Sequence, residues 1–176
     1  MSRSLLQVVL SASVFALTLG PDVASAETAE AAQVVALIND ERAARGLARL
    51  VSDPRLTAAA EDYAAEMAAA NFFSHVGPNG SRMTGRNEAH GYLGWQFMGE
   101  NLGAGQTTPA RVVLEWMNSP PHRANILNPS LNDCGIAIAT NPQSKYGYYF
   151  CVDFGARVGP APVHPVNARN PGFYHP

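Results

Sequence analysis

The chain has 176 residues, a formal net charge of −2 at pH 7 and 15% charged residues. This length suits one domain with a sizeable core. The small net charge and the absence of a basic run exclude a protein that binds nucleic acid or an anionic membrane through its overall charge.

The N-terminal segment has the features of a secretory signal peptide. Arg3 precedes an apolar, uncharged run over residues 5–19, and small residues occupy positions 24–26, where a signal peptidase cuts. The alternative is a retained membrane anchor, but the apolar run is short for a span of the bilayer. We therefore predict a signal peptide over residues 1–26, and a secreted protein, extracellular or periplasmic, with no transmembrane segment after cleavage.

Two helices are predicted in the first part of the mature chain. An apolar stripe at helical spacing, which includes Val34 and Ile38, predicts a helix over residues 30–44, and Gly46 follows as a stop signal. The second helix begins at Asp53-Pro54, where the carboxylate can cap free amides and proline takes the first helical position. Its buried face is marked by Leu56, Ala60, Tyr63 and Met67.

The segment from residue 71 to residue 105 is rich in Gly, Asn and Ser, with only a short helical pattern around residues 86–90. Long irregular connections in compact domains are often functional. A third helix begins at Thr108-Pro109 and ends at Pro120-Pro121, and a short helical turn is predicted over residues 122–127.

Two neighbouring strands are predicted over residues 135–139 and 148–154. Cys134 and Cys151 are the only cysteines, and an even number of cysteines in an exported chain is typical of a disulfide. We therefore predict a Cys134–Cys151 disulfide that joins the two strands. A catalytic thiol is the alternative, and it would require one cysteine to stay unpaired.

The last segment, residues 157–176, is rich in proline and has almost no apolar periodicity, which predicts an extended or disordered tail. The folded domain would therefore cover residues 27–156. Helices that frame a few antiparallel strands indicate an α+β domain built in layers.

Three local motifs carry the candidate chemistry: Phe73-Ser74-His75, Gly99-Glu100-Asn101-Leu102, and a segment from Glu115-Trp116 through His122 to Leu127. Together they resemble the signatures of the CAP superfamily, which includes cysteine-rich secretory proteins, insect venom antigens and plant pathogenesis-related proteins. The similarity is greatest to its short bacterial secreted branch, and it covers residues 34–155.

The resemblance implies a three-layer α-β-α sandwich with a small, mainly antiparallel central sheet and a cleft lined by a His, Glu, Glu, His tetrad. By position in the motifs, the cleft residues are His75, Glu100, Glu115 and His122. The second glutamate departs from the family pattern. Animal and plant members carry it after the helix tryptophan, near the position of Ser119, whereas Glu115 precedes that tryptophan.

The residue types of this cleft suit a divalent cation. The neutral imidazoles of His75 and His122 with the carboxylate of Glu100 are ligands for Zn²⁺ or a similar cation, and a fourth position would stay open to water or a ligand. In the alternative, these are structural groups: Glu100 pairs with a histidine or accepts backbone hydrogen bonds, and Glu115 is a surface partner of Arg111.

The resemblance implies a secreted, monomeric binding or interaction module, whose cleft holds a divalent cation and a small lipid-like or peptide-like ligand. No catalytic residue is assigned under this hypothesis, because no activated nucleophile accompanies the histidines. The alternative function is a metal-assisted hydrolase of an extracellular peptide, ester or cell-wall substrate, with Glu100 as general base. In a third interpretation the cleft is purely structural, and surface loops or the tail bind the partner.

Overall fold

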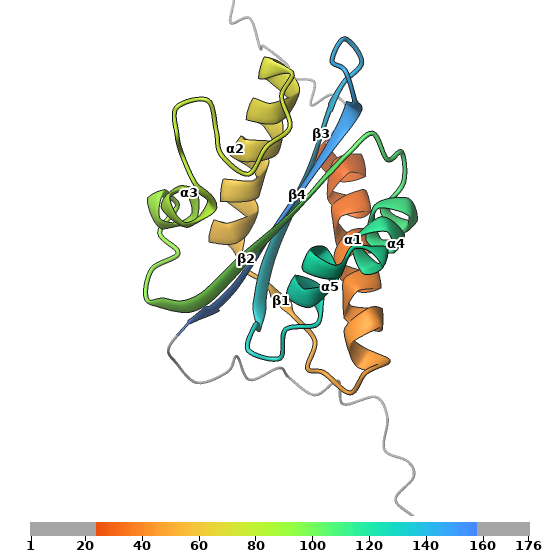
Figure 1. Cartoon of the computed structure of the whole chain (residues 1–176), viewed down its shortest axis with the longest axis vertical. Helices are drawn as coiled ribbons and strands as arrows, with labels where there is room; N and C mark the ends of the chain where they lie inside the picture. Colours follow the sequence, from red (N-terminus) through yellow and green to blue (C-terminus); the bar gives the residue numbers. More distant parts are fainter. Residues whose placement is uncertain (1–23, 158–176) are drawn as a thin grey trace, which may run out of the picture.

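The computed structural model describes residues 24–157 (Figure 1), with side chains described from residue 29 onward. Residues 1–23 of the predicted signal peptide and residues 158–176 of the predicted proline-rich tail lie outside the described residues, whereas Arg157, the first residue of that predicted tail, ends the last strand. No helix in the described part of the chain is both long enough and apolar enough to cross a membrane.

Helices cover both faces of a four-stranded sheet with the strand order β1-β3-β4-β2 (Figure 1). The strands are β1 (Val51–Ser52), β2 (Trp95–Ala104), β3 (Asp133–Asn141) and β4 (Gly147–Arg157). The short β1 pairs with β3 in parallel, and the other two pairs are antiparallel. The mainly antiparallel sheet predicted through the family resemblance is confirmed.

The helices form the outer two layers of the sandwich (Figure 1). On one side lie α2 (Pro54–Ala70) and α3 (Met83–Ala89), and on the other α1 (Ala24–Ala43), α4 (Pro109–Asn118) and α5 (Pro120–Ile126). Each side has its own apolar core: Trp116, Ile136 and Phe154 belong to the α1/α4/α5 core, and Tyr63 and Leu102 to the α2 core.

Local capping explains where two of the helices begin. The Asp53 carboxylate accepts a hydrogen bond from the backbone N–H of Arg55 at 3.0 Å, and Pro54 follows at the first helical position of α2. Thr108 and Pro109 start α4 in the same way. Ser119 then adopts an extended conformation, so that α4 ends and α5 begins at Pro120, in agreement with the predicted boundary.

The prediction that residues 71–105 are largely irregular is wrong for its last part, because Trp95–Ala104 forms β2. The glycines that suggested a loop are required by packing. A Cβ atom at Gly99 would lie 3.0 Å from the Asn125 side chain of α5, and one at Gly103 would lie 2.5 Å from Val112 of α4. Glycine lets these two helices approach the strand closely.

The predicted disulfide is wrong: Cys134 and Cys151 are both free and buried. Cys134 is paired with Phe154, whereas Cys151 is paired with Ala137, so the two cysteines are offset by three positions along the β3–β4 ladder. Since strand side chains alternate between faces, an odd offset places the two thiols on opposite faces of the sheet. Cys134 accordingly belongs to the α1/α4/α5 core and Cys151 to the α2 core.

Candidate functional site

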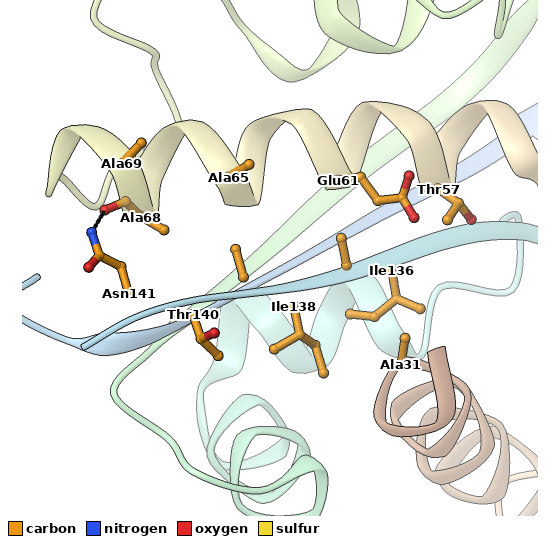
Figure 2. A pocket seen from close by; sticks show the side chains of 12 residues that line it. Ala31, Thr57, Glu61, Ala65, Ala68, Ala69, Ile136, Ile138, Thr140 and Asn141 are labelled. Atoms are coloured by element: carbon orange, nitrogen blue, oxygen red, sulfur yellow. Dashed lines mark hydrogen bonds between the residues drawn. The ribbon is translucent and has the colours of Figure 1, made fainter. Parts of the chain in front are cut away.

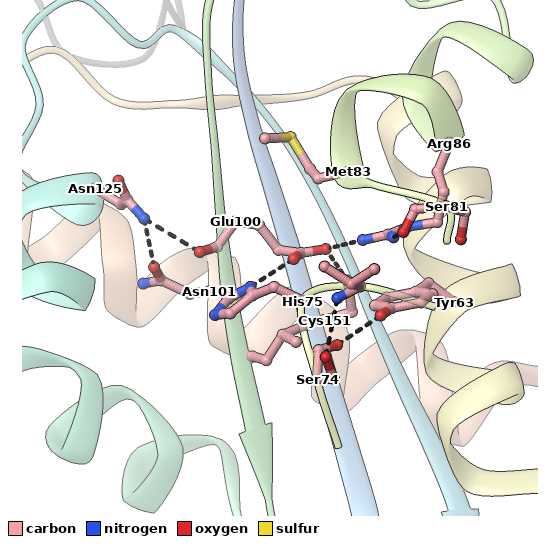
Figure 3. A network of polar contacts seen from close by, with 12 residues as sticks. Tyr63, Ser74, His75, Ser81, Met83, Arg86, Glu100, Asn101, Asn125 and Cys151 are labelled. Carbon is pink, nitrogen blue, oxygen red and sulfur yellow. Dashed lines mark hydrogen bonds and ion pairs between the residues drawn. The ribbon is translucent and has the colours of Figure 1, made fainter. Parts of the chain in front are cut away.

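Glu100 is the centre of a polar network on the α2 side of the sheet (Figure 3). Its side chain is only 4% exposed. One carboxylate oxygen, Oε1, lies 2.6 Å from Nδ1 of His75, and the other, Oε2, accepts a hydrogen bond from the guanidinium of Arg86. Both oxygens of this buried carboxylate therefore have a specific partner.

Arg86 supplies the positive charge that balances Glu100. It projects from α3 with a side chain that is 9% exposed, and its guanidinium lies 3.3 Å from the centroid of the Tyr63 ring. It also donates a hydrogen bond to the backbone carbonyl of Ser81 at 3.2 Å. Sequence reasoning assigned no role to Arg86, because a single arginine in a short helix produces no periodic or motif signal.

The loop that carries His75 is held by α2. The hydroxyl of Tyr63 donates to the backbone carbonyl of Ser74 at 2.5 Å, and Val76 forms an isolated antiparallel bridge with Arg82. These contacts place the imidazole of His75, which is 58% exposed, over the buried carboxylate of Glu100. The hydrogen bond with that carboxylate raises the pKa of His75 above its ordinary value.

His122 is held from the other direction, by asparagines on β2 and α5. The Asn101 side-chain amide donates to the backbone carbonyl of His122 at 3.1 Å. The Asn125 amide donates to the Asn101 side chain at 2.9 Å and to the Glu100 carbonyl at 3.1 Å (Figure 3). Partial burial lowers the pKa of His122, and the charge of His75 lowers it further. His75 therefore contacts Glu100 directly, and His122 lies near enough to His75 for the charge of one imidazole to affect the other.

Glu115 is placed apart from these three residues. It lies on the exposed surface of α4, where its carboxylate accepts hydrogen bonds from Arg111 Nε at 3.1 Å and Gln106 Nε2 at 2.5 Å. The Gln106 bond and then the Arg111 bond lower the pKa of Glu115. These contacts favour the interpretation in which Glu115 is a surface partner of Arg111.

A second layer of acidic groups lies beneath Glu100 and was not identified from the sequence. Among the described residues, Glu100, Cys151 and Asp153 form a buried cluster. Each offers one potential metal-ligand atom, and these three atoms all lie within 4.8 Å of one another. Neither carboxylate oxygen of Asp153 has a hydrogen-bond partner within the described part of the chain. Burial, and then the nearby charge of Glu100, raise the pKa of Asp153 well above its usual value.

We predict that His75 and His122 titrate on opposite sides of pH 6.5, the ordinary histidine pKa, with His75 above it and His122 below it. The interaction of His75 with Glu100 stabilises the folded chain fully at a pH below the pKa that His75 has in the unfolded chain. This stability is lost as the pH rises through the higher pKa of His75 in the folded chain.

For His122 the sign is reversed. The folded chain loses stability as the pH falls through the lowered pKa that His122 has in the folded chain.

A titration of the histidine Cε1–H resonances by NMR, with His75→Gln and His122→Gln variants for assignment, measures both pKa values. Because the Glu100 hydrogen bond is the main cause of the raised value, Glu100→Gln should move the His75 pKa downward. A His75 pKa below that of His122 in the unmodified chain would contradict the described geometry.

Comparisons with known proteins agree with this architecture. Residues 35–154 match the family model described as CAP, the cysteine-rich secretory protein family. The chain is 38% identical over 104 residues to the uncharacterized protein YkwD of Bacillus subtilis, a match that covers 59% of this chain and 40% of that protein. The chain therefore spans less than half the length of this relative.

Two solved bacterial structures share the fold. An extracellular protein containing a SCP domain from Bacillus anthracis superposes with a TM-score of 0.68 at 26% identity, over 82% of this chain and 46% of that one. An outer surface protein from Borrelia burgdorferi superposes with a TM-score of 0.63 at 26% identity, over 70% of this chain and 90% of that one. Both are described as proteins of the cell exterior.

Proposed function

Because the chain belongs to the CAP family, with most of its length inside the family's domain, we propose that it is an exported binding module. In this proposal the cleft of His75 and His122 holds a divalent cation and presents it to a small lipid-like or peptide-like ligand. The signal-peptide features of residues 1–26 support export. The extracellular and outer-surface descriptions of the two similar bacterial structures point in the same direction.

The observation that carries the proposal is the hydrogen bond between His75 Nδ1 and a carboxylate that is itself held by Arg86. When Nδ1 donates to a carboxylate, the tautomer is set and Nε2 keeps its lone pair for a metal. His122, with its lowered pKa, is neutral at pH 7 and offers a second nitrogen. Two imidazoles suit Zn²⁺, and the remaining positions would be open to water or ligand.

The donor set also limits the role of Glu100. Among the described residues, His75, Glu100 and His122 do not form a group of three ligand atoms that all lie within 4.8 Å. Both oxygens of Glu100 already have partners, so Glu100 fits better as the residue that orients His75 than as a third ligand. A bound zinc would supply a Lewis acid at which an oxygen or nitrogen of the ligand is recognised.

The same engagement makes Glu100 a poor general base, which favours binding over the hydrolase alternative. A general base must reach the attacking water and accept its proton. The carboxylate is instead 4% exposed and held on one side by a guanidinium. We therefore give the hydrolase function second place, and zinc-dependent turnover of peptide, ester or peptidoglycan substrates that Glu100→Gln abolishes would reverse this order.

Calorimetric titration with zinc tests the proposed cleft. We expect one site in the full chain, and we expect His75→Ala or His122→Ala to weaken zinc affinity by about 100-fold, because each removes one of two protein ligands. Glu100→Gln removes the orienting charge and is expected to weaken affinity by about 10-fold.

The matched control is His90→Ala. His90 lies at the end of α3, and its Nε2 is 3.1 Å from Asp62, so it is a partly buried histidine that also pairs with a carboxylate but lies outside the cleft. Its loss should leave zinc affinity unchanged. Thermal melts of all variants without metal separate ligand loss from unfolding. Binding heats that are the same in both cleft variants and in the control would rule out this site.

A further inference from the structure

The outer edge of β3 is an unpaired sheet edge over most of its length. The short β1 pairs only with Asp133 and Cys134, and the backbone carbonyl of Cys134 accepts a hydrogen bond from Asp53 N–H at 2.8 Å. Since backbone groups of alternate strand residues point to the same side, those of Ile136 and Ile138 also face this edge. Within the described part of the chain, no backbone partner covers them.

This edge forms the floor of a groove of about 590 Å³ between two helices (Figure 2). One wall is α2, which contributes the small residues Ala65, Ala68 and Ala69. On the other side, Ile136 and Ile138 point away from α2 and towards Ala31 of α1 (Figure 2). The small alanine side chains of this wall leave open volume beside the strand.

We propose that this groove binds an extended peptide segment of a partner protein, which adds to β3 as a fifth strand. An added strand would satisfy the edge donors and acceptors of β3, and its alternate side chains would contact the alanine wall. The groove lies at the opposite edge of the sheet from β2, which carries Glu100. The proposal is therefore independent of the metal cleft.

The lining indicates the charge of this peptide. Glu61 is the only ionisable side chain among the groove residues, it is exposed, and it takes part in no ion pair among the described residues. A peptide with Lys or Arg opposite Glu61 would complement this charge. The remaining lining is mostly alanine and isoleucine, which suits small or medium apolar side chains at the other inward positions.

A second copy of the chain fits this edge poorly. The β3 strand lies between α2 and α1 (Figure 2), so two copies joined edge to edge would bring four helices together. A free extended segment has no such flanking helices.

Selection of random heptapeptides displayed on phage, with the purified full chain as bait and an Ala65→Arg variant for counter-selection, provides the probe. Ala65 is exposed and lines the groove, so an arginine there fills the site without entering the core. Ala70→Arg is the matched control, because Ala70 is exposed on the same helix outside the groove. The synthetic form of the best peptide is then titrated by fluorescence anisotropy.

We expect Ala65→Arg to weaken peptide binding by more than about tenfold and Ala70→Arg to leave it unchanged. Glu61→Lys should weaken binding of peptides that carry Lys or Arg. Because the affinity comes from backbone hydrogen bonds, only the peptide amides that face β3 matter, and these are every second amide of the added strand. N-methylation of this set of amides should abolish binding, whereas N-methylation of the other set should have little effect.

Several results would overturn the proposal. One is a selection that recovers no peptide that binds the unmodified chain more tightly than Ala65→Arg. Equal binding by the two N-methylated peptides would also overturn it. Binding that strengthens by about tenfold after deletion of residues 158–176 would show that the tail of the chain itself occupies the groove. A dimer in sedimentation velocity that Ala65→Arg dissociates would assign the groove to a second copy.

Discussion

Replacement of Arg42 with methionine is expected to lower the free energy of unfolding by about 4 kcal/mol. Arg42 is fully buried, and its guanidinium donates to four backbone carbonyls and, among the residues that the structure describes, to no carboxylate. The acceptors are the carbonyls of Ala48, Ile126, Asn128 and Leu131, at 2.7 to 3.0 Å. Methionine keeps most of the apolar stem but leaves these carbonyls without their donor in a dry site.

The loss would also reach the candidate cleft. Ile126 is the last residue of α5, the helix that carries His122, and Arg42 ties this end of α5 to α1. Urea denaturation followed by circular dichroism measures the change. Arg45→Met is the control, because Arg45 is exposed and its ion pair with Glu41 contributes about 0.5 kcal/mol at most. A loss below about 1 kcal/mol in Arg42→Met would contradict this account of the buried guanidinium.

Gly135→Ala is expected to destabilise the chain by about 3 kcal/mol or more, although it adds a single methyl group. A Cβ atom at this position on β3 would lie 2.1 Å from the backbone carbonyl carbon of Leu56 and 2.2 Å from the backbone nitrogen of Thr57. Both are main-chain atoms of α2, so no side-chain rotation can relieve the clash. The whole helix would have to move away from the sheet.

Gly85→Ala is the matched control for this substitution. Gly85 lies inside α3, and a Cβ atom there would have no neighbour within 4 Å. Alanine at that position should be neutral or stabilising by up to about 1 kcal/mol, because alanine favours the helix. Equal midpoints of urea denaturation for the two variants would show that α2 does not pack against β3 as described.

The clash at Gly135 also bears on the cleft, because α2 supplies the Tyr63 hydroxyl that holds the loop of His75. A displaced α2 should release the contact between Tyr63 and Ser74. If the Gly135→Ala protein still folds, its His75 pKa should therefore move towards the ordinary value as the hydrogen bond to Glu100 weakens. The NMR titration described above measures this shift.

Local patterns were sufficient for several elements of the fold. Asp53-Pro54 and Thr108-Pro109 start α2 and α4 as predicted, because a cap and an N-terminal proline act within one turn of helix. The β3 and β4 strands followed from short apolar runs bounded by turn residues. The β2 strand was missed, because its glycines serve packing against α4 and α5, and a contact between distant segments leaves no local pattern.

The cysteines show the same limit. Their even number and their place beside two neighbouring strands suggested a disulfide, but the β3–β4 register decides which face each thiol occupies. A shift of one residue reverses that choice. Register depends on all the pairs of the ladder together, so neither cysteine could reveal it.

The sequence by itself determined the residues His75, Glu100 and His122 as candidates, because family motifs are local and survive in order along the chain. Only the tertiary structure decided what surrounds them. It brought Arg86 from α3 and Asp153 from β4 to Glu100, and it placed Glu115 on the exposed surface with Arg111. Helix packing and strand register set these neighbours, and both depend on contacts between residues far apart in the chain.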